Sequence, residues 1–240
     1  MLTKTLIGVV IATVLVVAIA ITFPVLVTHK PAVEKKVMQK IEVGERIKLP
    51  VPDYMSNTSV EEALSKRRSI RTYSGEGLSI DEVSQLLWAA QGITGKGRTA
   101  PSAGALYPLE LYMVVGDVEG LDKGVYKYRP VEHELEKVVD GDKREELAEA
   151  AGGQECVKEA AIDIVFTAIY ERTTWKYGDR GIRYVYMEAG HAAQNVYLQA
   201  VSLELGTVVI GAFIGDRVKE LVNAEEQEVP LYIMPVGRQG

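Results

Sequence analysis

The sequence has almost none of the residues that form disulfides and metal sites. Its 240 residues include one cysteine, Cys156, and three scattered histidines. A single cysteine excludes an internal disulfide and a zinc site built on cysteines. The chain has no HExxH pattern and no facing pair of histidines, so the sequence predicts no protein-bound metal.

Motifs of several large enzyme classes are absent as well. The chain has no GxSxG, no P-loop and no GxGxxG after an expected strand, which disfavours a serine hydrolase, an NTPase and a Rossmann dinucleotide domain. Aromatic residues make up only 7% of the chain, whereas 47% of it is hydrophobic and 25% is charged. These values are ordinary for a globular protein, and they exclude a chain that is disordered, collagen-like or coiled coil throughout.

The charge is distributed unevenly along the chain. The first 50 residues carry seven Lys or Arg and three acidic residues, a net charge of +4, whereas the remaining 190 carry 20 basic and 30 acidic residues, a net charge of −10. Binding to nucleic acid needs a basic face that neutralises phosphates. The acidic body therefore predicts no nucleic-acid partner.

An uncharged run near the N-terminus, Leu6 to Val27, predicts a membrane anchor. Its 22 residues are enough to cross the roughly 30 Å hydrocarbon core, which needs about 20. The alternative is a cleaved signal peptide with a small-x-small site at Ala18-Ile19-Ala20, but the apolar run continues past that site. We therefore expect one transmembrane helix within residues 1–28.

The segment after this run, residues 29–56, is rich in Lys, Glu and Pro and has little periodicity. It predicts a tether between the anchor and a domain at residues 57–240. Four lysines follow the apolar run closely and one precedes it. Because positively charged flanks stay in the cytoplasm, this bias predicts a single-pass membrane protein with its domain on the cytoplasmic side.

From residue 57 onward the pattern mixes helices and strands and contains no repeat. Two capping boxes, Ser59 to Glu62 and Ser79 to Glu82, predict helix starts, and apolar periodicity predicts the longest helix over Ile182 to Leu205. Expected strands cover 109–115, 125–128, 135–139, 162–169, 207–210 and 231–236, and expected helices also cover 142–151 and 215–222. This mixture indicates an α+β or α/β domain with a sheet flanked by helices.

Three segments contain candidate ligand-binding residues. The first, Arg67-Arg68-Ser69-Ile70-Arg71, predicts either a bound anion, since guanidinium groups match phosphate geometry, or a solvated basic patch. The second, Thr99 to Pro108, has small residues that either leave the backbone open to a flat ligand or form a plain turn. The third, Gly206 to Gly215, contains Gly211, and Gly237-Arg238 follows near the C-terminus.

The order of these segments, Arg-Arg-Ser-x-Arg, then Pro-Ser-Ala-Gly, then Gly-Ala-Phe with a terminal Gly-Arg, resembles the FMN-dependent nitroreductase family over about residues 59–238. Pro-Ser-Ala-Gly-Ala-Leu-Tyr-Pro and Tyr-Gly-Asp-Arg-Gly-Ile-Arg-Tyr are most similar to its SagB-type branch, the thiazoline/oxazoline dehydrogenase-like proteins. Typical nitroreductases carry Asn where this chain has Ala105, so that flavin contact does not carry over. The resemblance implies an α+β, three-layer fold with a central mixed sheet flanked by helices, and a homodimer with FMN at the subunit interface.

The resemblance also implies roles for individual residues. The FMN phosphate and ribityl chain would be held by the arginine-rich segment and the C-terminal pair: Arg67, Arg68, Ser69, Arg71, Gly237 and Arg238. The isoalloxazine would be lined, from the partner subunit, by Pro101, Ser102, Ala103 and Gly104. The backbone at Ile210 and Gly211 would face flavin N5, where an N–H stabilises charge during hydride transfer. A phosphate of about −2 charge explains why arginines occur in an acidic body.

Lys176 and Tyr177 match the pair that acts in proton removal in azoline-oxidising members of the branch. Dehydrogenation next to nitrogen needs a base to take a proton while N5 takes the hydride, and a Lys can lower the pKa of a neighbouring Tyr. The alternative is a plain packing or salt-bridge role. His191 is a weaker candidate, for which a satisfied core histidine is favoured over a ligand contact, and Cys156 is expected to be buried and inert.

The sequence therefore predicts an FMN-dependent oxidoreductase that transfers hydride or electrons between a reduced donor and a small organic substrate. Without a Rossmann domain, NAD(P)H as a donor would bind transiently over the flavin face. Two alternatives stay open. One is a non-catalytic, membrane-tethered flavin-binding module, and the other is an azoline-type dehydrogenase that uses oxygen as acceptor.

Overall fold

The computed structural model describes residues 41–240, so the predicted anchor, Leu6 to Val27, lies outside the described residues. No helix within residues 41–240 is long and apolar enough to cross a membrane. The described helices are α1 (Val60–Lys66), α2 (Ile80–Gln91), α3 (Arg144–Ala150), α4 (Glu155–Glu159), α5 (Glu171–Tyr177), α6 (Arg180–Ser202) and α7 (Gly215–Leu221).

The strands build one large sheet and one small hairpin. The large sheet has the order β1-β6-β5-β4-β7-β9-β8, with β1 (Arg46–Lys48), β4 (Leu109–Val115), β5 (Gly124–Arg129), β6 (Glu134–Asp140), β7 (Ile162–Ile169), β8 (Leu205–Thr207) and β9 (Glu228–Arg238). The hairpin consists of β2 (Ile93–Thr94) and β3 (Gly97–Arg98).

The sheet is antiparallel at each of its strand pairs, so the expectation of a mixed sheet is wrong for the described residues. Short connections, such as the one from β5 to β6, can only join antiparallel neighbours. The alternation of helical and strand patterns in the sequence does not reveal strand direction, because a helix can return the chain to either end of a sheet.

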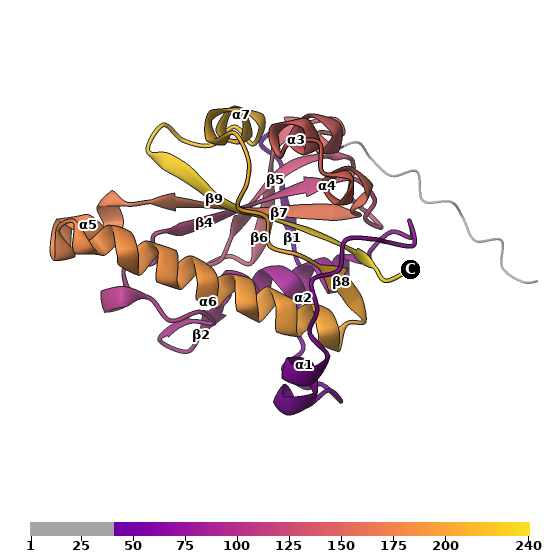
Figure 1. The fold of residues 1–240 in the computed structure, drawn as a ribbon, viewed down its shortest axis with the longest axis horizontal. Coiled ribbons are helices and arrows are strands. Elements are labelled where there is room, and N and C mark those ends of the chain that lie inside the picture. Colours follow the sequence, from indigo (N-terminus) through magenta and orange to yellow (C-terminus); the bar gives the residue numbers. More distant parts are fainter. Residues whose placement is uncertain (1–40) are drawn as a thin grey trace, which may run out of the picture. The chain divides into compact units, whose positions relative to one another are not determined.

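Helices cover both faces of the sheet, as Figure 1 shows, with α3, α4 and α7 on one face and α2 and α6 on the other. The central strand β7 is buried along its whole length and pairs with β4 from Leu109↔Ala168 to Val115↔Ile162. The long helix α6 packs against α2 and the sheet through small and apolar side chains: Val185, Ala189, Ala192, Ala193, Val196 and Ala200. The predicted three-layer α+β arrangement is therefore confirmed.

The last part of the predicted tether, residues 41–56, is folded onto the domain. Here β1 pairs with β6, with Arg46 opposite Glu136, and the Ile41 backbone N–H donates to Asp122 Oδ2 at 2.6 Å. Leu49 is 3% exposed. The strand β1 has three residues, too few to show an alternation of apolar and polar side chains. The predicted start of the domain, residue 57, therefore lies after these contacts.

Most other predicted elements are confirmed with shifted ends. Both capping serines accept backbone N–H groups, Ser59 from Glu62 and Ser79 from Glu82, and at Ser79 the full capping box forms. The last strand is longer than the predicted 231–236, running from residue 228 to 238. The hairpin of β2 and β3 was not predicted.

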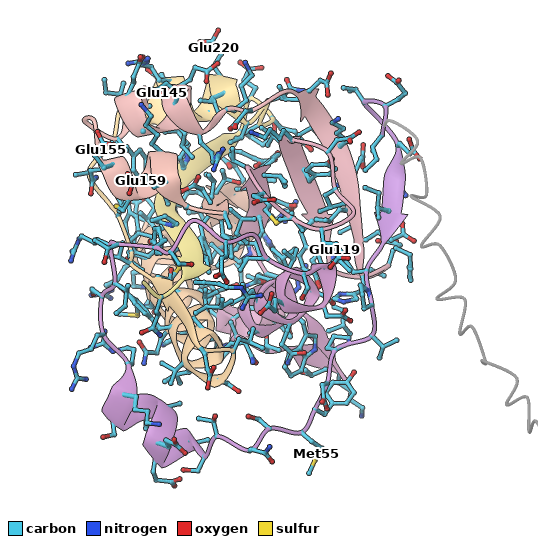
Figure 2. All side chains as sticks on the ribbon, turned by 90° about the vertical axis from the view of Figure 1, so that its right-hand side faces the viewer. Met55, Glu119, Glu145, Glu155, Glu159 and Glu220 are labelled. Atoms are coloured by element: carbon cyan, nitrogen blue, oxygen red, sulfur yellow. The ribbon has the colours of Figure 1, made fainter. Side chains whose placement is uncertain are left out.

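Part of the acidic charge of the body lies on the outer helices α3, α4 and α7. Figure 2 shows Glu145 on α3, Glu155 and Glu159 on α4 and Glu220 on α7, all with side chains directed outward. These four residues are exposed. The helical layer that carries them is not the one against which α6 packs.

A buried ion pair and its hydrogen bonds link four strands of the sheet, β4, β5, β7 and β9. Lys127 Nζ lies 2.8 Å from Glu228 Oε1, and the two side chains are 5% and 0% exposed. Tyr112 donates to the same carboxylate oxygen at 2.9 Å, and Thr167 donates to the other. Burial alone would lower the pKa of Lys127, but its hydrogen bond to Glu228 and the nearby charge of Glu110 outweigh burial and raise that pKa.

Replacing Lys127 with Met is expected to lower the free energy of unfolding by about 3–5 kcal/mol, because the Glu228 carboxylate would stay buried without its cation. The matched control is Lys66→Met, which removes an exposed pair with Glu62 on α1 and should have no measurable effect. Urea unfolding of the wild type and both variants measures the loss of unfolding free energy in each variant. Equal losses in the two variants would contradict the conclusion that Lys127 compensates the buried Glu228 carboxylate.

Candidate functional site

The predicted anion-binding segment leaves the end of α1 and runs beside β8. The Ile70 N–H donates to the Thr207 carbonyl at 2.9 Å, which holds the segment on the strand. The Arg67 guanidinium lies 5.2 Å from the centre of the Tyr197 ring on α6, and Ser69 Oγ is 3.2 Å from the Tyr197 hydroxyl. Tyr197, which the sequence analysis did not single out, therefore positions this segment.

The arginines of this segment have no carboxylate partner among residues 41–240. Arg68 donates to the carbonyls of Ser65 and Arg67, and Arg68 and Arg71 are exposed. We call Arg67, Arg68, Ser69 and Arg71 the arginine cluster. Like charges held this close repel one another, and a multiply charged anion with oxygen acceptors would relieve that repulsion.

The C-terminal pair lies beside the chain that follows the arginine cluster, where the Ser74 N–H donates to the Arg238 carbonyl at 3.0 Å. Arg238 Nη2 lies 3.0 Å from Glu82 Oε2 at the start of α2, and Arg238 Nε lies 3.7 Å from Glu76. This guanidinium is thus engaged by carboxylates of its own chain. Gly237 is buried, and a Cβ there would lie 2.7 Å from the Tyr73 ring. Packing alone explains that glycine, and the cofactor roles of both residues stay predictions.

Of the two backbone donors predicted after β8, Ile210 and Gly211, one is free. The Ile210 N–H donates to the Ile233 carbonyl at 2.8 Å, so it is not free to face a ligand as predicted. Gly211 is exposed, and its N–H has no hydrogen bond within the described part of the chain. Just before it, the Val209 N–H donates to the Tyr197 hydroxyl at 2.8 Å. Tyr197 therefore joins the arginine cluster to this segment.

The Pro-Ser-Ala-Gly segment has an unusual backbone. Gly104, Ala105 and Tyr107 have φ angles of 63°, 53° and 47°, in the left-handed region that costs a non-glycine residue energy. Ser102 Oγ accepts the Tyr107 N–H at 2.9 Å, and the Arg98 guanidinium lies 4.8 Å from the Tyr107 ring centre. Strain of this kind persists only where the surroundings hold it in place.

This segment meets the predicted Lys-Tyr pair at Gly104. A Cβ on Gly104 would lie 2.7 Å from the Tyr177 hydroxyl and 2.9 Å from Lys176 Nζ, so both groups approach the backbone of this segment closely. The Tyr177 ring packs edge-on against Tyr184 of α6 with 5.2 Å between ring centres. Lys176 is exposed and forms no ion pair with any described residue.

Beside this meeting point lies a pocket of about 270 Å³. Its lining combines the Pro-Ser-Ala-Gly segment with the first half of α6: Pro101, Ser102, Ala103, Tyr184, Met187, Glu188 and His191. We call this space, with Gly104, Lys176 and Tyr177 at its side, the loop pocket. His191 is exposed, so the favoured prediction of a core histidine is wrong.

Glu188 is the functional candidate that the sequence analysis missed. Its side chain is 2% exposed, and its Oε1 atom has no hydrogen-bond partner among the described residues. Burial raises the pKa of Glu188 to about 7, although a hydrogen bond from Ser102 and the charge of Arg98 act against it. The signal was present in the sequence, because Val185, Glu188 and Ala192 fall on one helical face.

Neither Cys156 nor a second, larger cavity has the features of a catalytic site. Cys156 is buried, and burial raises the pKa of its thiol, as expected for an inert cysteine. A larger cavity of about 470 Å³ lies between α1, α2 and α6, and Arg98 is the one charged residue in its lining. This cavity contains no predicted site residue and offers no acid or base for proton transfer.

The structure thus gathers the predicted residues at two places along α6. Tyr197, with the arginine cluster, and Glu188, with the loop pocket, are nine residues apart, which corresponds to roughly 13 Å along a helix. Nine residues correspond to about two and a half helical turns, so the two side chains leave α6 on opposite sides.

A model of the nitroreductase family matches residues 64–238. The chain belongs to the nitroreductase family. A nitroreductase homologue of Methanocaldococcus jannaschii is 47% identical over 82% of this chain and 99% of its own length. The microcin B17-processing protein McbC of Escherichia coli is 28% identical over 88% of this chain and 82% of its own length. An FMN reductase [NAD(P)H] of Bacillus subtilis is 27% identical over 74% of this chain and 62% of its own length.

These comparisons confirm the resemblance drawn from the sequence, including its azoline dehydrogenase-like branch, to which McbC belongs. The chain is an oxidoreductase of the nitroreductase superfamily, and its relatives include flavin-dependent enzymes.

The titration of Glu188 predicts a pH dependence of stability. Its pKa is about 7 in the folded chain and about 4.3 in an unfolded one. Between these values the folded state binds more protons, so the free energy of unfolding falls as the pH rises. From about pH 4.5 to pH 7.5, the wild type should lose about 3 kcal/mol relative to Glu188→Gln, which cannot ionise.

Urea unfolding at several pH values measures this difference, and the buried carboxyl of Asp163 cancels because both proteins contain it. The control is Glu62→Gln, at an exposed carboxylate whose pKa is lowered by Lys66. Its pH dependence between pH 5 and pH 8 should match that of the wild type. Parallel curves for wild type and Glu188→Gln would show that Glu188 does not titrate near neutrality.

Proposed function

We propose that this chain is an FMN-dependent oxidoreductase that passes hydride or electrons between a reduced donor and a small organic substrate. The observation that carries the proposal is the unpaired arginine cluster, which Tyr197 holds on the same helix as the loop pocket. An FMN phosphate carries a charge of about −2 and three acceptor oxygens, which match this donor set. The relationship to an FMN reductase supports the choice of flavin.

In this proposal each group of residues has a separate task. Arg67, Arg68, Ser69 and Arg71 bind the phosphate and neutralise its charge. The small residues 101–104 lie along the flat isoalloxazine, and the free Gly211 N–H donates to its polar edge. When bound, FMN supplies the reversible uptake of hydride. NAD(P)H is proposed as a donor that binds transiently, because residues 41–240 contain no dedicated dinucleotide domain.

The proposal includes a homodimer and the membrane anchor. Large apolar side chains are exposed along α5 and α6, namely Trp175, Ile182, Tyr186 and Met187. A second copy of the chain would cover them and bring its own residues 101–104 toward the flavin. The run Leu6 to Val27 would tether the dimer to a membrane, with the domain on the cytoplasmic side.

A second candidate function is an azoline-type dehydrogenase with oxygen as acceptor. The observation that favours it is the meeting of Lys176 Nζ and the Tyr177 hydroxyl at Gly104, beside the pocket proposed for the ring. A base is needed there, because dehydrogenation next to nitrogen releases a proton together with the hydride. The similarity to McbC supports this candidate.

The visible spectrum of the purified full-length chain tests the proposal directly. We expect bound or reconstitutable FMN, and bleaching by NAD(P)H under nitrogen if that donor is used. A chain that binds no FMN would overturn the proposal. FMN binding without turnover for any donor and acceptor would instead support the non-catalytic flavin-binding module.

Arg67→Gln is expected to weaken FMN binding about 10-fold to 100-fold, because it removes one charge-assisted hydrogen bond to phosphate. The matched control is Lys66→Gln, one residue earlier, whose side chain pairs with Glu62. That variant should bind FMN like the wild type. Flavin fluorescence titration measures both affinities, and equal weakening would indicate long-range attraction rather than a phosphate site.

Tyr177→Phe separates the two candidate functions. If Tyr177 takes the proton, the variant should keep its FMN affinity and lose at least about 100-fold in oxygen consumption with a thiazoline substrate. Reduction of quinones or nitro compounds should be unaffected. The control is Tyr184→Phe, which removes a hydroxyl from the ring that packs on Tyr177. If Tyr177→Phe leaves oxygen consumption unchanged, Lys176 and Tyr177 have only a packing role.

A further inference from the structure

The loop pocket contains a carboxyl group whose hydrogen bonding is incomplete. Glu188 lines the pocket, is 2% exposed and leaves Oε1 without a partner among the described residues. A buried polar atom without a partner is costly, and native structures keep one mainly where a ligand or a function requires it. Ser102, whose hydroxyl acts to lower the pKa of the same carboxyl group, belongs to the segment proposed to lie along the flavin ring.

The surroundings of this carboxyl favour its neutral form without excluding the charged one. Arg98 on β3 is the cation whose charge acts on Glu188, and it is itself held by Gln91 and stacked on Tyr107. Other charged groups sit on elements packed against this part of α6: Arg172 and Lys176 on α5, Glu110 on β4 and His191 on α6 itself. Arg172 is paired with Glu110 at 2.6 Å.

We propose that Glu188 is the proton-binding group of the loop pocket, and that an aromatic ligand with hydrogen-bond acceptors at its edge binds there together with one proton. The proton comes from solvent and forms an O–H on the carboxylate, which then donates to the ligand. The inference rests on the proposed function, in which the ligand is the flavin ring. Nothing is oxidised or reduced in this step.

The physical reason is desolvation. A ligand that fills the pocket removes the remaining water near the carboxylate, and its acceptor edge repels a negative charge. Both effects favour the protonated form, in which the orphan Oε1 gains a partner. Binding and protonation are then coupled, so that each strengthens the other by the same factor.

The experiment titrates FMN into the flavin-free full-length chain between pH 6 and pH 8.5. For the wild type, the dissociation constant should rise about tenfold from pH 6 to pH 8, because one proton is linked to binding. Glu188→Gln keeps a neutral donor of the same shape and should bind FMN with little change above pH 7. The FMN phosphate also titrates, with a pKa of about 6, but it does so equally with both proteins.

An infrared titration of the flavin-free chain provides the second readout. The wild type should show a protonated-carboxyl band that disappears with a midpoint near pH 7, and Glu188→Gln should lack that component. Equal pH profiles of FMN binding in the two proteins would overturn this inference and leave the proposed function standing. Failure to bind FMN at any pH, with the carboxyl titration present, would overturn the proposed function instead.

Discussion

The packing of α6 against α2 and the sheet is the contact on which the rest of the site depends. Its buried face consists mostly of small residues, Ala189, Ala192, Ala193 and Ala200, so the helix lies close to its neighbours. Close packing of this kind leaves little freedom to shift or rotate. The side chains that α6 directs toward the site, Glu188 and Tyr197, are therefore held at fixed positions.

Tyr197 and Glu188 perform opposite tasks on that helix. Tyr197 contacts two chain segments that are far apart in sequence. Its hydroxyl contacts Ser69 and accepts the Val209 N–H, and its ring lies against Arg67. Glu188 instead stays partly unpaired in a pocket, where burial raises its pKa to about 7. One end of the site thus suits a fixed negative charge, and the other suits a group that exchanges a proton.

The fold shows where the charged side chains of the body lie. The body carries a net charge of −10 after residue 50, and exposed glutamates on the outer helices α3, α4 and α7 contribute to it (Figure 2). The arginine cluster lies next to α6, in the other helical layer, and has no carboxylate beside it in residues 41–240. Arg238 differs because Glu82 lies within 3.0 Å of it. The anion site inferred from charge in the sequence stays a prediction, and one of its arginines, Arg238, is paired within the chain.

By itself the sequence determined the helix starts at Ser59 and Ser79, the long helix and most strand cores, because these follow from local periods and capping. It also singled out three candidate ligand-binding segments by their residue types. Tertiary structure alone decided the antiparallel strand directions and the contacts of residues 41–56, since neither leaves a local pattern. It also decided which backbone donors are free: Ile210 is bound to Ile233, whereas Gly211 is open. The pocket around Glu188 could arise only there, because desolvation by distant segments is what changes the pKa of a carboxyl group.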